Sequence, residues 1–372
     1  MSERYLGLMS GTSADGIDAA VVEFDGDRCT ALVAAGHRDY PEALRRRLLQ
    51  VSVEQPTLSL REFAQLDAAI GDAFAEAARA LLADHGIDPA SITAIGSHGQ
   101  TVFHDGPQGL SLQLGDANRI AVATGITTVA DFRRLDCALG GQGAPLAPAF
   151  HRALFGQRGE DRVVLNLGGI ANVTLLPGRT PAAPVIGFDT GPANGLMDEW
   201  TQRCCGRPYD ENGGLAASGR VDEAMVEALL GDPYFALPAP KSTGRDYFRL
   251  DWALARHPAM RALSPADVQA SLAQVTVRSV ADAVRATLPT AARLIVCGGG
   301  ARNAELLRLL GMILPGVVID TSEQHGLAPE WIEAAAFAWL AMRRMNGQPG
   351  NLTRVTGARQ PASLGSVILA PR

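Results

Sequence analysis

One pattern occurs twice in this chain and limits the folds that it can adopt: a strand, a glycine turn and a second strand. The first copy lies in Tyr5–Phe24 and the second in Arg162–Leu176. Each copy begins a segment in which strands and helices are mixed. A single duplication is too little for a solenoid. The sequence therefore predicts an α/β protein of two similar lobes that face each other across a cleft, each contributing one hairpin.

Hydrophobic periodicity predicts the remaining elements. Strands are expected over Ile17–Phe24, Thr30–His37, Ile92–Ser97, Thr128–Asp131, Val163–Leu167, Asn172–Leu176, Val185–Phe188 and Leu294–Cys297. Helices are expected over Arg61–His85, Asp116–Thr124, Asn194–Cys204, Ala266–Thr287 and Pro329–Met345, and from Asn303 onward. The Gly/Pro stretch Cys137–Pro148 lacks periodicity, which predicts a domain boundary and a hinge near Leu139–Gly143. We expect one lobe at 1–138 together with a tail from about 350 to 372, and the other at 139–349.

The composition excludes several classes of protein. The length of 372 residues suits about two domains. A net charge of −6 argues against a nucleic-acid binder, which needs a basic surface. No apolar run approaches the ~18 residues of a membrane span, and the N-terminus lacks the apolar segment of a signal peptide. The five cysteines have no C-x-x-C spacing, as expected in a reducing cytoplasm. We expect a cytoplasmic protein that acts on small molecules; its oligomeric state, with a homodimer as one option, stays open.

The first glycine turn, Ser10–Gly16 (SGTSADG), is suited to phosphate. Two glycines allow backbone N–H groups to face an anion, and Asp15 and Asp18 could hold Mg²⁺ through water. An ordinary hairpin turn would need only one Gly and one Asn or Asp. The polar loop therefore favours phosphate binding, although the chain has neither a Walker A loop nor a Rossmann G-x-G-x-x-G.

Two further glycine turns follow predicted strands: Gly168-Gly169 after Asn166, and Gly298-Gly299-Gly300 before a helix. Close packing of backbone explains the latter about as well as a ligand does. Three such turns in one chain favour a common nucleotide.

Asp189 lies at the end of a predicted strand, where active sites of open α/β sheets occur. Its carboxylate could act as a general base. The alternative is a cap of the helix that begins near Asn194, although Asn194 can itself cap.

Polar residues also follow the strand at Ile92–Ser97. Ser97, His98 and Gln100 offer donors and acceptors for a sugar, and Arg133 could pair with a carboxylate. Such a His is more often structural, and such an Arg is usually solvated. Lys241 is the only Lys among 33 basic residues, which indicates a need for a compact charge, although one residue could be chance.

Taken together, the segments resemble those of the anhydro-N-acetylmuramic acid kinase family from end to end. The resemblance rests on Leu6–Asp18 (LGLMSGTSADGID), Gly96–Thr101 (GSHGQT), Ala130–Arg134 (ADFRR), Gly140–Leu146 (GGQGAPL), Val164–Val173 (VLNLGGIANV), Gly187–Asn194 (GFDTGPAN), Pro240–Arg245 (PKSTGR), Val296–Asn303 (VCGGGARN) and Glu333–Ala341 (EAAAFAWLA). It implies two actin-like (ribonuclease H-like) lobes with a central nucleotide cleft. It also implies a reaction in which ATP and water convert 1,6-anhydro-N-acetylmuramic acid to N-acetylmuramic acid 6-phosphate, in murein recycling.

The resemblance also implies roles for particular residues. Asp189 matches the catalytic aspartate, in the lobe that carries the second phosphate loop and the adenosine motif. ATP binding is expected at Gly11, Thr12, Ser13, Ala14, Asp15, Gly16, Ile17, Asp18, Asn166, Gly168, Gly169, Gly298, Gly299, Gly300 and Asn303. Sugar binding is expected at Ser97, His98, Gln100, Arg133 and Glu333, in the first lobe. Asp15 and Asp18 would hold Mg²⁺ through water.

Three positions depart from the family pattern. Ala14 stands where Met or Leu is common, which should matter little for backbone contacts. Ala193 stands where Gly is usual, so the turn would differ if that position needs a positive φ. Asn166 stands where many actin-like kinases have Asp, which shifts the metal toward the first loop.

The alternatives to this function are another sugar or carboxylate kinase, a non-catalytic nucleotide switch, and an anhydro-sugar hydrolase that does not use ATP.

Overall fold

The computed structural model describes residues 2–11, 13–180, 182–244 and 246–371, and the chain forms two compact units. Unit 1 comprises the residues up to Leu154 together with those from Trp331 onward, and unit 2 comprises Phe155–Glu330. The two boundaries differ from those expected at residues 138 and 350.

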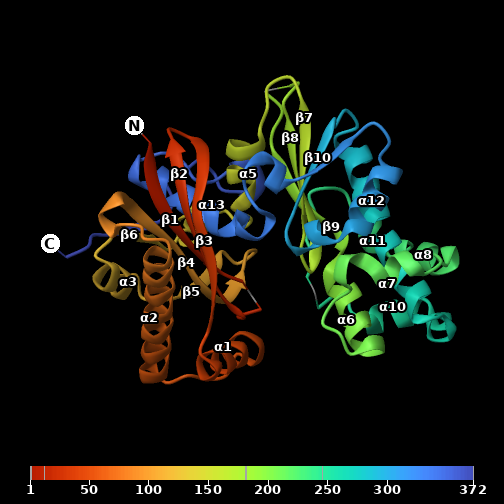
Figure 1. The fold of residues 1–372 in the computed structure, drawn as a ribbon, viewed down its shortest axis with the longest axis horizontal. Coiled ribbons are helices and arrows are strands. Elements are labelled where there is room, and N and C mark those ends of the chain that lie inside the picture. The colour runs from red at the N-terminus through yellow and green to blue at the C-terminus, as the bar shows by residue number, and fades with distance from the viewer. Residues whose placement is uncertain (1, 12, 181, 245, 372) are drawn as a thin grey trace. The chain divides into compact units, whose positions relative to one another are not determined.

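Unit 1 is built on a seven-stranded sheet (Figure 1). Its strands are β1 (Glu3–Ser10), β2 (Gly16–Asp25), β3 (Arg28–Asp39), β4 (Ile92–Asp105), β5 (Leu110–Leu114), β6 (Thr128–Ala130) and β12 (Ser366–Ile368). Its helices are α1 (Glu42–Glu54), α2 (Leu60–Asp84), α3 (Ala117–Thr124), α4 (Arg134–Ala138), α5 (Ala147–Phe155), α13 (Ile332–Met345) and α14 (Thr353–Thr356). Strands β3, β2 and β1 form an antiparallel meander, and β4 and β6 continue the sheet parallel to β1.

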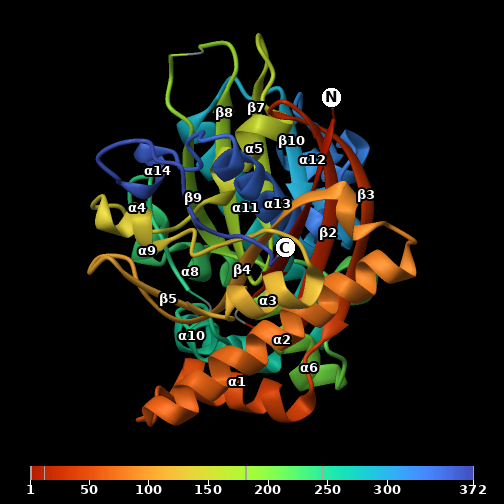
Figure 2. The same cartoon turned by 90° about the vertical axis from the view of Figure 1, so that its left-hand side faces the viewer.

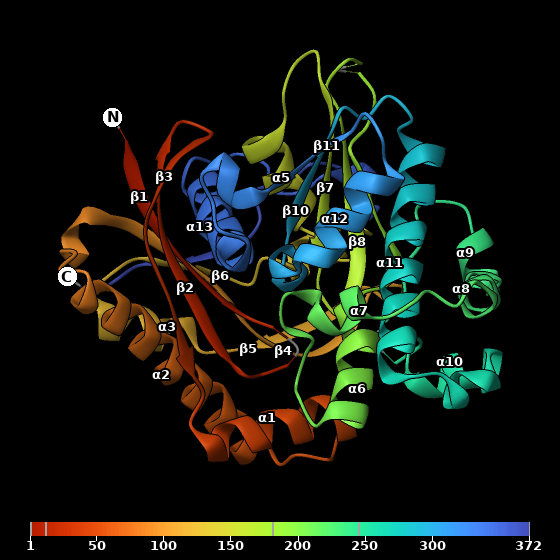
Figure 3. The same cartoon turned by 45° about the vertical axis from the view of Figure 1, so that its right-hand side comes forward.

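Unit 2 is built on a five-stranded sheet (Figure 3). Its strands are β7 (Asp161–Leu167), β8 (Ile170–Pro177), β9 (Ile186–Pro192), β10 (Arg293–Cys297) and β11 (Val318–Thr321). Its helices are α6 (Asn194–Cys205), α7 (Gly214–Ser218), α8 (Glu223–Leu230), α9 (Pro233–Ala236), α10 (Leu250–Arg256), α11 (Pro265–Thr287) and α12 (Ala304–Ile313). Strands β9, β8 and β7 form an antiparallel meander, and β10 and β11 continue parallel to β7.

The two sheets share one strand order, β3-β2-β1-β4-β6 in unit 1 and β9-β8-β7-β10-β11 in unit 2. In each unit a glycine turn joins the central strand of the sheet to the next strand of the meander. The duplication predicted from the two hairpins is therefore confirmed and extends over five strands of each sheet.

Small residues allow α13 to lie very close to the sheet of unit 1. A Cβ on Gly7 would lie 1.8 Å from the carbonyl oxygen of Ala334, and a Cβ on Gly96 would lie 2.0 Å from that of Phe337. Both obstacles are backbone atoms, which cannot move aside as a side chain could. The sequence had suggested that the segment 333–341 belongs to the other lobe. This packing explains why it belongs to unit 1 instead.

Helix α5 packs against α13, since the centroids of the Phe150 and Trp339 rings lie 6.0 Å apart. The residues of both helices were expected in the lobe at 139–349, yet apart from Phe155 they belong to unit 1. Their sequences show that they have an apolar face but not which sheet that face covers.

The opposite face of the unit 1 sheet is covered by α2 (Figure 2). Successive side chains of a strand point to opposite faces, so Leu6 and Leu8 point away from α13. They belong to one buried cluster with Ile70 and Phe74 of α2. The helix begins at a capping box formed at Ser59.

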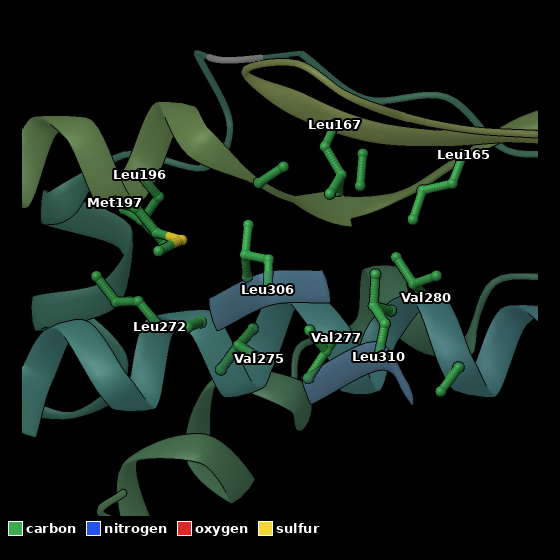
Figure 4. Packing of buried hydrophobic residues seen from close by; sticks show 14 of the residues in the cluster. Leu165, Leu167, Leu196, Met197, Leu272, Val275, Val277, Val280, Leu306 and Leu310 are labelled. Carbon is green, nitrogen blue, oxygen red and sulfur yellow. The ribbon is translucent and has the colours of Figure 1, made fainter. Parts of the chain in front are cut away.

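Part of the core of unit 2 lies between its sheet and the helices α6, α11 and α12 (Figure 4). The side chains that fill it come from β7 (Leu165, Leu167), α6 (Leu196, Met197), α11 (Leu272, Val275, Val277, Val280) and α12 (Leu306, Leu310). This packing fixes the ends of β7 and β10, where the second and third glycine turns occur.

The five cysteines are free. No helix in the described part of the chain combines the length and the apolar character that a membrane crossing requires.

Candidate functional site

The first glycine turn, between β1 and β2, is held by a buried glutamine from β4. The Ser10 hydroxyl oxygen lies 2.7 Å from the Gly16 carbonyl oxygen and 2.6 Å from Oε1 of Gln100, and its single proton can be donated to either acceptor. The Gln100 amide donates to the Gly11 carbonyl (3.0 Å). Gln100 is fully buried, so its side chain supports the loop, whereas the sequence predicted that it contacts the sugar.

The two glycines of this turn, Gly11 and Gly16, have different explanations. A Cβ on Gly16 would lie 2.5 Å from the Arg38 carbonyl oxygen, so the pairing of β2 with β3 requires glycine there. A Cβ on Gly11 would meet only the Ser13 hydroxyl, at an ordinary 3.7 Å. Within the described residues, packing does not require glycine at position 11, which favours a close approach by a ligand.

The other predicted residues of the turn contribute in several ways. Asp15 Oδ1 accepts hydrogen bonds from the Ser13 hydroxyl (3.0 Å) and the Gly16 N–H (3.0 Å). Ala14 is buried with a φ of 47°, and Ile17 is buried in the core, so only their backbones can face a ligand. Thr12 lies outside the described residues.

Asp18, a predicted metal residue, is engaged with a histidine. Its Oδ1 lies 2.7 Å from Nδ1 of His37. Burial acts to lower the pKa of His37, but the hydrogen bonds to Asp18 and Asp39 and the charges of Asp18 and Asp15 together raise that pKa. The described residues hold no group of three or more His, Cys, Asp or Glu that could bind a metal. A hydrated Mg²⁺ on phosphate needs only one or two carboxylates, so Asp15 and Asp18 still fit the role predicted for them.

The predicted sugar residues Ser97 and His98 lie inside β4, because that strand continues to Asp105 instead of ending at Ser97. Nε2 of His98 accepts hydrogen bonds from Nε (3.1 Å) and a terminal nitrogen (2.9 Å) of Arg133. Burial, assisted by the charge of Arg133, lowers the pKa of His98 well below its usual value. His98 is therefore neutral and serves to orient the Arg133 guanidinium.

Arg133 is fixed but is not neutralised by an ion pair. It also donates to the Gly143 carbonyl (2.9 Å), and no carboxylate of the described residues lies within ion-pair distance of it. Glu333, in the first turn of α13, is exposed, yet surrounding atoms displace enough water to raise its pKa, and Asp18 acts in the same direction. Arg133 acts in the opposite direction on that pKa, which indicates that the two groups lie in the same region of unit 1.

The second and third glycine turns meet in unit 2. A Cβ on Gly298 would lie 2.3 Å from Oδ1 of Asn166, and one on Gly300 would lie 2.5 Å from the Leu167 Cβ. Packing therefore requires these two glycines. Gly168 and Gly299 meet nothing closer than 3.6 Å and 3.9 Å, so a ligand explains these two better than packing does.

Backbone bonds connect the Gly168-Gly169 turn to α6. The N–H of Ala193 donates to the Gly169 carbonyl (3.2 Å), and that of Asn194 to the Gly168 carbonyl (3.0 Å). Ala193 has a φ of −134°, so this position does not have the positive φ that would favour glycine. Asn303, predicted to bind ATP, caps α12 by accepting from the Leu306 N–H (3.1 Å).

Asp189, in β9, does not cap α6. The N-cap residue of that helix is Ala193, and no side-chain hydrogen bond caps it. Oδ2 of Asp189 instead accepts from the Thr243 N–H (2.9 Å). Burial raises the pKa of Asp189, and the Thr243 bond acts against this rise. Among the residues that the structure describes, this half-buried carboxylate accepts one backbone hydrogen bond, which suits a general base.

The segment 234–243 also contacts Asp189, and this role was not predicted from the sequence. The Tyr234 hydroxyl donates to the Asp189 carbonyl (2.8 Å), and the Asp189 N–H donates to the Lys241 carbonyl (2.9 Å). The retained lysine was the available signal, but it did not indicate a partner.

The repeated strand order and the glycine turns define an α/β protein of two similar units, each built on a mixed sheet. The family model described as anhydro-N-acetylmuramic acid kinase matches residues 3–370. The chain belongs to the anhydro-N-acetylmuramic acid kinase family.

Curated relatives agree with this membership. A protein named anhydro-N-acetylmuramic acid kinase from Xanthomonas campestris pv. campestris is 53% identical over 98% of this chain and 97% of its own. The protein of that name from Shewanella halifaxensis is 50% identical over 97% of each chain. Among solved structures, the ADPNP-bound activator of 2-hydroxyisocaproyl-CoA dehydratase from Clostridium difficile is 12% identical, with a TM-score of 0.47 over 92% of this chain and 96% of its own.

Proposed function

We propose that the chain is an ATP-dependent kinase that opens 1,6-anhydro-N-acetylmuramic acid with water and phosphorylates O6. The products are N-acetylmuramic acid 6-phosphate and ADP, as murein recycling requires. The observation that carries the proposal is the half-buried carboxylate of Asp189 in a chain that belongs to this family.

The 1,6-anhydro bridge joins O6 to C1, so O6 carries no hydroxyl that a kinase could use directly. Asp189 accepts a proton from water as the water oxygen bonds to C1. The C1–O6 bond breaks, and O6 attacks the γ-phosphorus of ATP. The bond between that phosphorus and the ADP oxygen then breaks, and Asp189 releases its proton to solvent, which restores the base.

The glycine turns would bind the phosphates of ATP. Gly11 and Gly168 each have room for a close ligand, and backbone N–H groups at such turns stabilise phosphate charge. Mg²⁺, when bound with ATP, supplies further charge neutralisation. Asp15 and Asp18 are the residues that would hold it through water.

Arg133 would recognise the sugar. Muramic sugars carry a lactyl carboxylate. A guanidinium that His98 orients, and that pairs with no carboxylate among the described residues, suits such a group. Ser97 and Glu333 would contact the remaining polar groups of the ring. Because the reaction consumes ATP, the proposal places the protein in the cytoplasm.

The test is turnover of matched sugars with ATP. The purified protein should form ADP and a sugar 6-phosphate in equal amounts from the anhydro sugar. It should not do so from N-acetylmuramic acid, which lacks the bridge. Equal or faster phosphorylation of N-acetylmuramic acid would indicate an ordinary sugar kinase, and sugar opening without ATP would indicate a hydrolase.

A further inference from the structure

Asp189 is bonded at three of its atoms to the segment 234–243. Its N–H donates to the Lys241 carbonyl (2.9 Å), its carbonyl accepts from the Tyr234 hydroxyl (2.8 Å), and its Oδ2 accepts from the Thr243 N–H (2.9 Å). Strand β9 lies at the edge of its sheet. The segment therefore occupies the side of Asp189 that faces away from β8 and determines where the carboxylate points.

One end of this segment is anchored in the interior of unit 2. Asp232, which is 1% exposed, accepts from the Tyr234 N–H (2.7 Å), the Tyr247 hydroxyl (3.0 Å) and the Trp252 indole N–H (2.8 Å). Arg256 also pairs with Asp232. Helix α9, which carries Tyr234, is thus fixed where it begins.

The other end is fixed by the ammonium of Lys241. Nζ donates to the carbonyls of Tyr234 (2.9 Å) and Phe235 (3.1 Å) and lies 4.5 Å from the centroid of the Tyr234 ring. Within the described residues, no carboxylate is within ion-pair distance of it. Burial lowers the pKa of Lys241, as expected for an ammonium that is held by carbonyls and an aromatic face rather than by a counter-charge.

This arrangement explains why a chain with 32 arginines keeps one lysine here. An ammonium is a compact group with three donors in a tetrahedral arrangement, and it can reach two successive carbonyls beneath a ring. A planar guanidinium is larger, and its donors diverge in one plane. Tyr234 donates to the Asp189 carbonyl, and the Lys241 carbonyl accepts from the Asp189 N–H. The Lys241 ammonium therefore links the two residues that hold the Asp189 backbone.

We propose that Lys241 is a positioning residue for Asp189: its ammonium closes the segment 234–243, and that segment holds the carboxylate in the orientation from which it takes a proton. This inference rests on the proposed role of Asp189 as the base. Lys241 itself touches neither the substrate nor the reacting atoms in this account.

The experiment compares Lys241→Met, Asp189→Asn and the double variant in the full-length protein, with the exposed Arg261→Met as a control for loss of a cation. Lys241→Met should lower kcat by about 10- to 100-fold, as small misplacements of a catalytic group do, and leave the KM for ATP unchanged. In the Asp189→Asn background it should cost nothing further, because its only effect is through Asp189. Arg261→Met should behave as the parent protein does.

The pH profile supplies a readout that general loosening of the fold would not move. If the Thr243 bond to Oδ2 is lost, the pKa of Asp189 rises further, because that bond stabilises the charged form. The acid limb of kcat should therefore move to higher pH in Lys241→Met. The other titratable groups beside Asp189 are Tyr234, whose pKa is raised by burial, and Lys241 itself; neither titrates on the acid side.

The outcomes separate the inference from the function on which it rests. Near-normal turnover in Asp189→Asn would overturn the proposed base and the inference together. Loss in Asp189→Asn with normal turnover in Lys241→Met, or equal losses from Lys241→Met in both backgrounds, would overturn the inference alone. If Lys241→Met does not fold, Tyr234→Phe removes only the hydroxyl that bonds the Asp189 carbonyl. It should reduce kcat severalfold with the same non-additivity, and a normal kcat in that variant would contradict the inference.

Discussion

At the scale of single residues, Asp189 differs from a surface carboxylate in how it is held and solvated. It is half buried, and its carboxylate accepts a hydrogen bond from the Thr243 N–H. Asp189→Asn keeps the shape but removes the basicity, so turnover should fall by about 10²–10⁴-fold while ATP still binds. Steady-state kinetics with calorimetry of ATP binding would check both parts. Turnover close to that of the parent protein would exclude Asp189 as the base.

The pH dependence follows from the same environment. Burial raises the pKa of Asp189, and only the deprotonated form accepts a proton. Activity should therefore rise with pH through a pKa above the ordinary value for aspartate, and it should fall as the pH drops below it. A kcat profile measured at saturating ATP and sugar would show this limb. A flat profile across the acid range would contradict the assignment.

The glycine at position 11 allows a direct test of the phosphate site. A Cβ there meets only the Ser13 hydroxyl at 3.7 Å, so Gly11→Val should leave the fold intact and block the phosphates. We expect weaker ATP binding by at least tenfold, about 1.4 kcal/mol, with an unchanged thermal transition. Gly214→Ala, at a position where a Cβ meets nothing within 4 Å, is the matched control. Unchanged ATP affinity in folded Gly11→Val would remove this loop from the nucleotide site.

The sequence indicates which residues belong to the candidate site better than it indicates what those residues contact. It selected His98, but only coordinates show that its ring accepts from Arg133. It selected Gln100 for the sugar, yet that side chain is buried beneath the glycine turn. Pairings between residues distant in sequence, such as Asp189 with Thr243, depend on the folded chain and leave no local pattern.

At the scale of elements, the close approach of α13 to β1 and β4 is the most demanding contact of unit 1. Gly7→Ala would bring a methyl group to 1.8 Å from the Ala334 carbonyl oxygen, so helix and sheet would have to separate. We expect a loss of about 1–3 kcal/mol or more in the free energy of unfolding, as for overpacked cores. Denaturant unfolding would measure it.

The control is Gly36→Ala in β3, where a Cβ would meet only a flexible Leu81 methyl group at 3.3 Å. This variant should change stability little. Equal stability of Gly7→Ala and Gly36→Ala would contradict the packing described for α13.

The long elements were the most predictable from sequence. Helices α2 and α11 follow their apolar spacing closely, because each covers a sheet with one continuous face. The short β5 and β11 and the helices α7–α10 were not predicted, since four to eight residues carry too little periodicity. Strand β4 was predicted too short, because the polar residues from Ser97 onward are buried by the glycine turn and by Arg133 rather than exposed.

At the scale of the whole molecule, the chain passes between the units at Leu154–Phe155 and at Glu330–Trp331. The predicted hinge near Leu139–Gly143 lies within unit 1, where the Gly143 N–H donates to buried Asp136 (2.9 Å). Because active sites commonly exclude bulk water from bound substrate, we predict that the molecule becomes more compact on binding. Small-angle scattering with a non-hydrolysable ATP analogue and sugar should give a smaller radius of gyration than the free protein. Identical profiles at saturation would argue against closure.

Isotopic labelling can show whether opening of the anhydro bridge is coupled to phosphoryl transfer. In ¹⁸O-water, attack of water at C1 and of O6 on phosphorus should place label on the anomeric hydroxyl and none in the phosphate ester. Mass spectrometry of early samples, taken before the anomeric oxygen exchanges with solvent, would locate the label. One labelled anomeric oxygen for each ADP is the predicted result. Label in free phosphate, without sugar 6-phosphate, would contradict the account and indicate that water is the only phosphoryl acceptor.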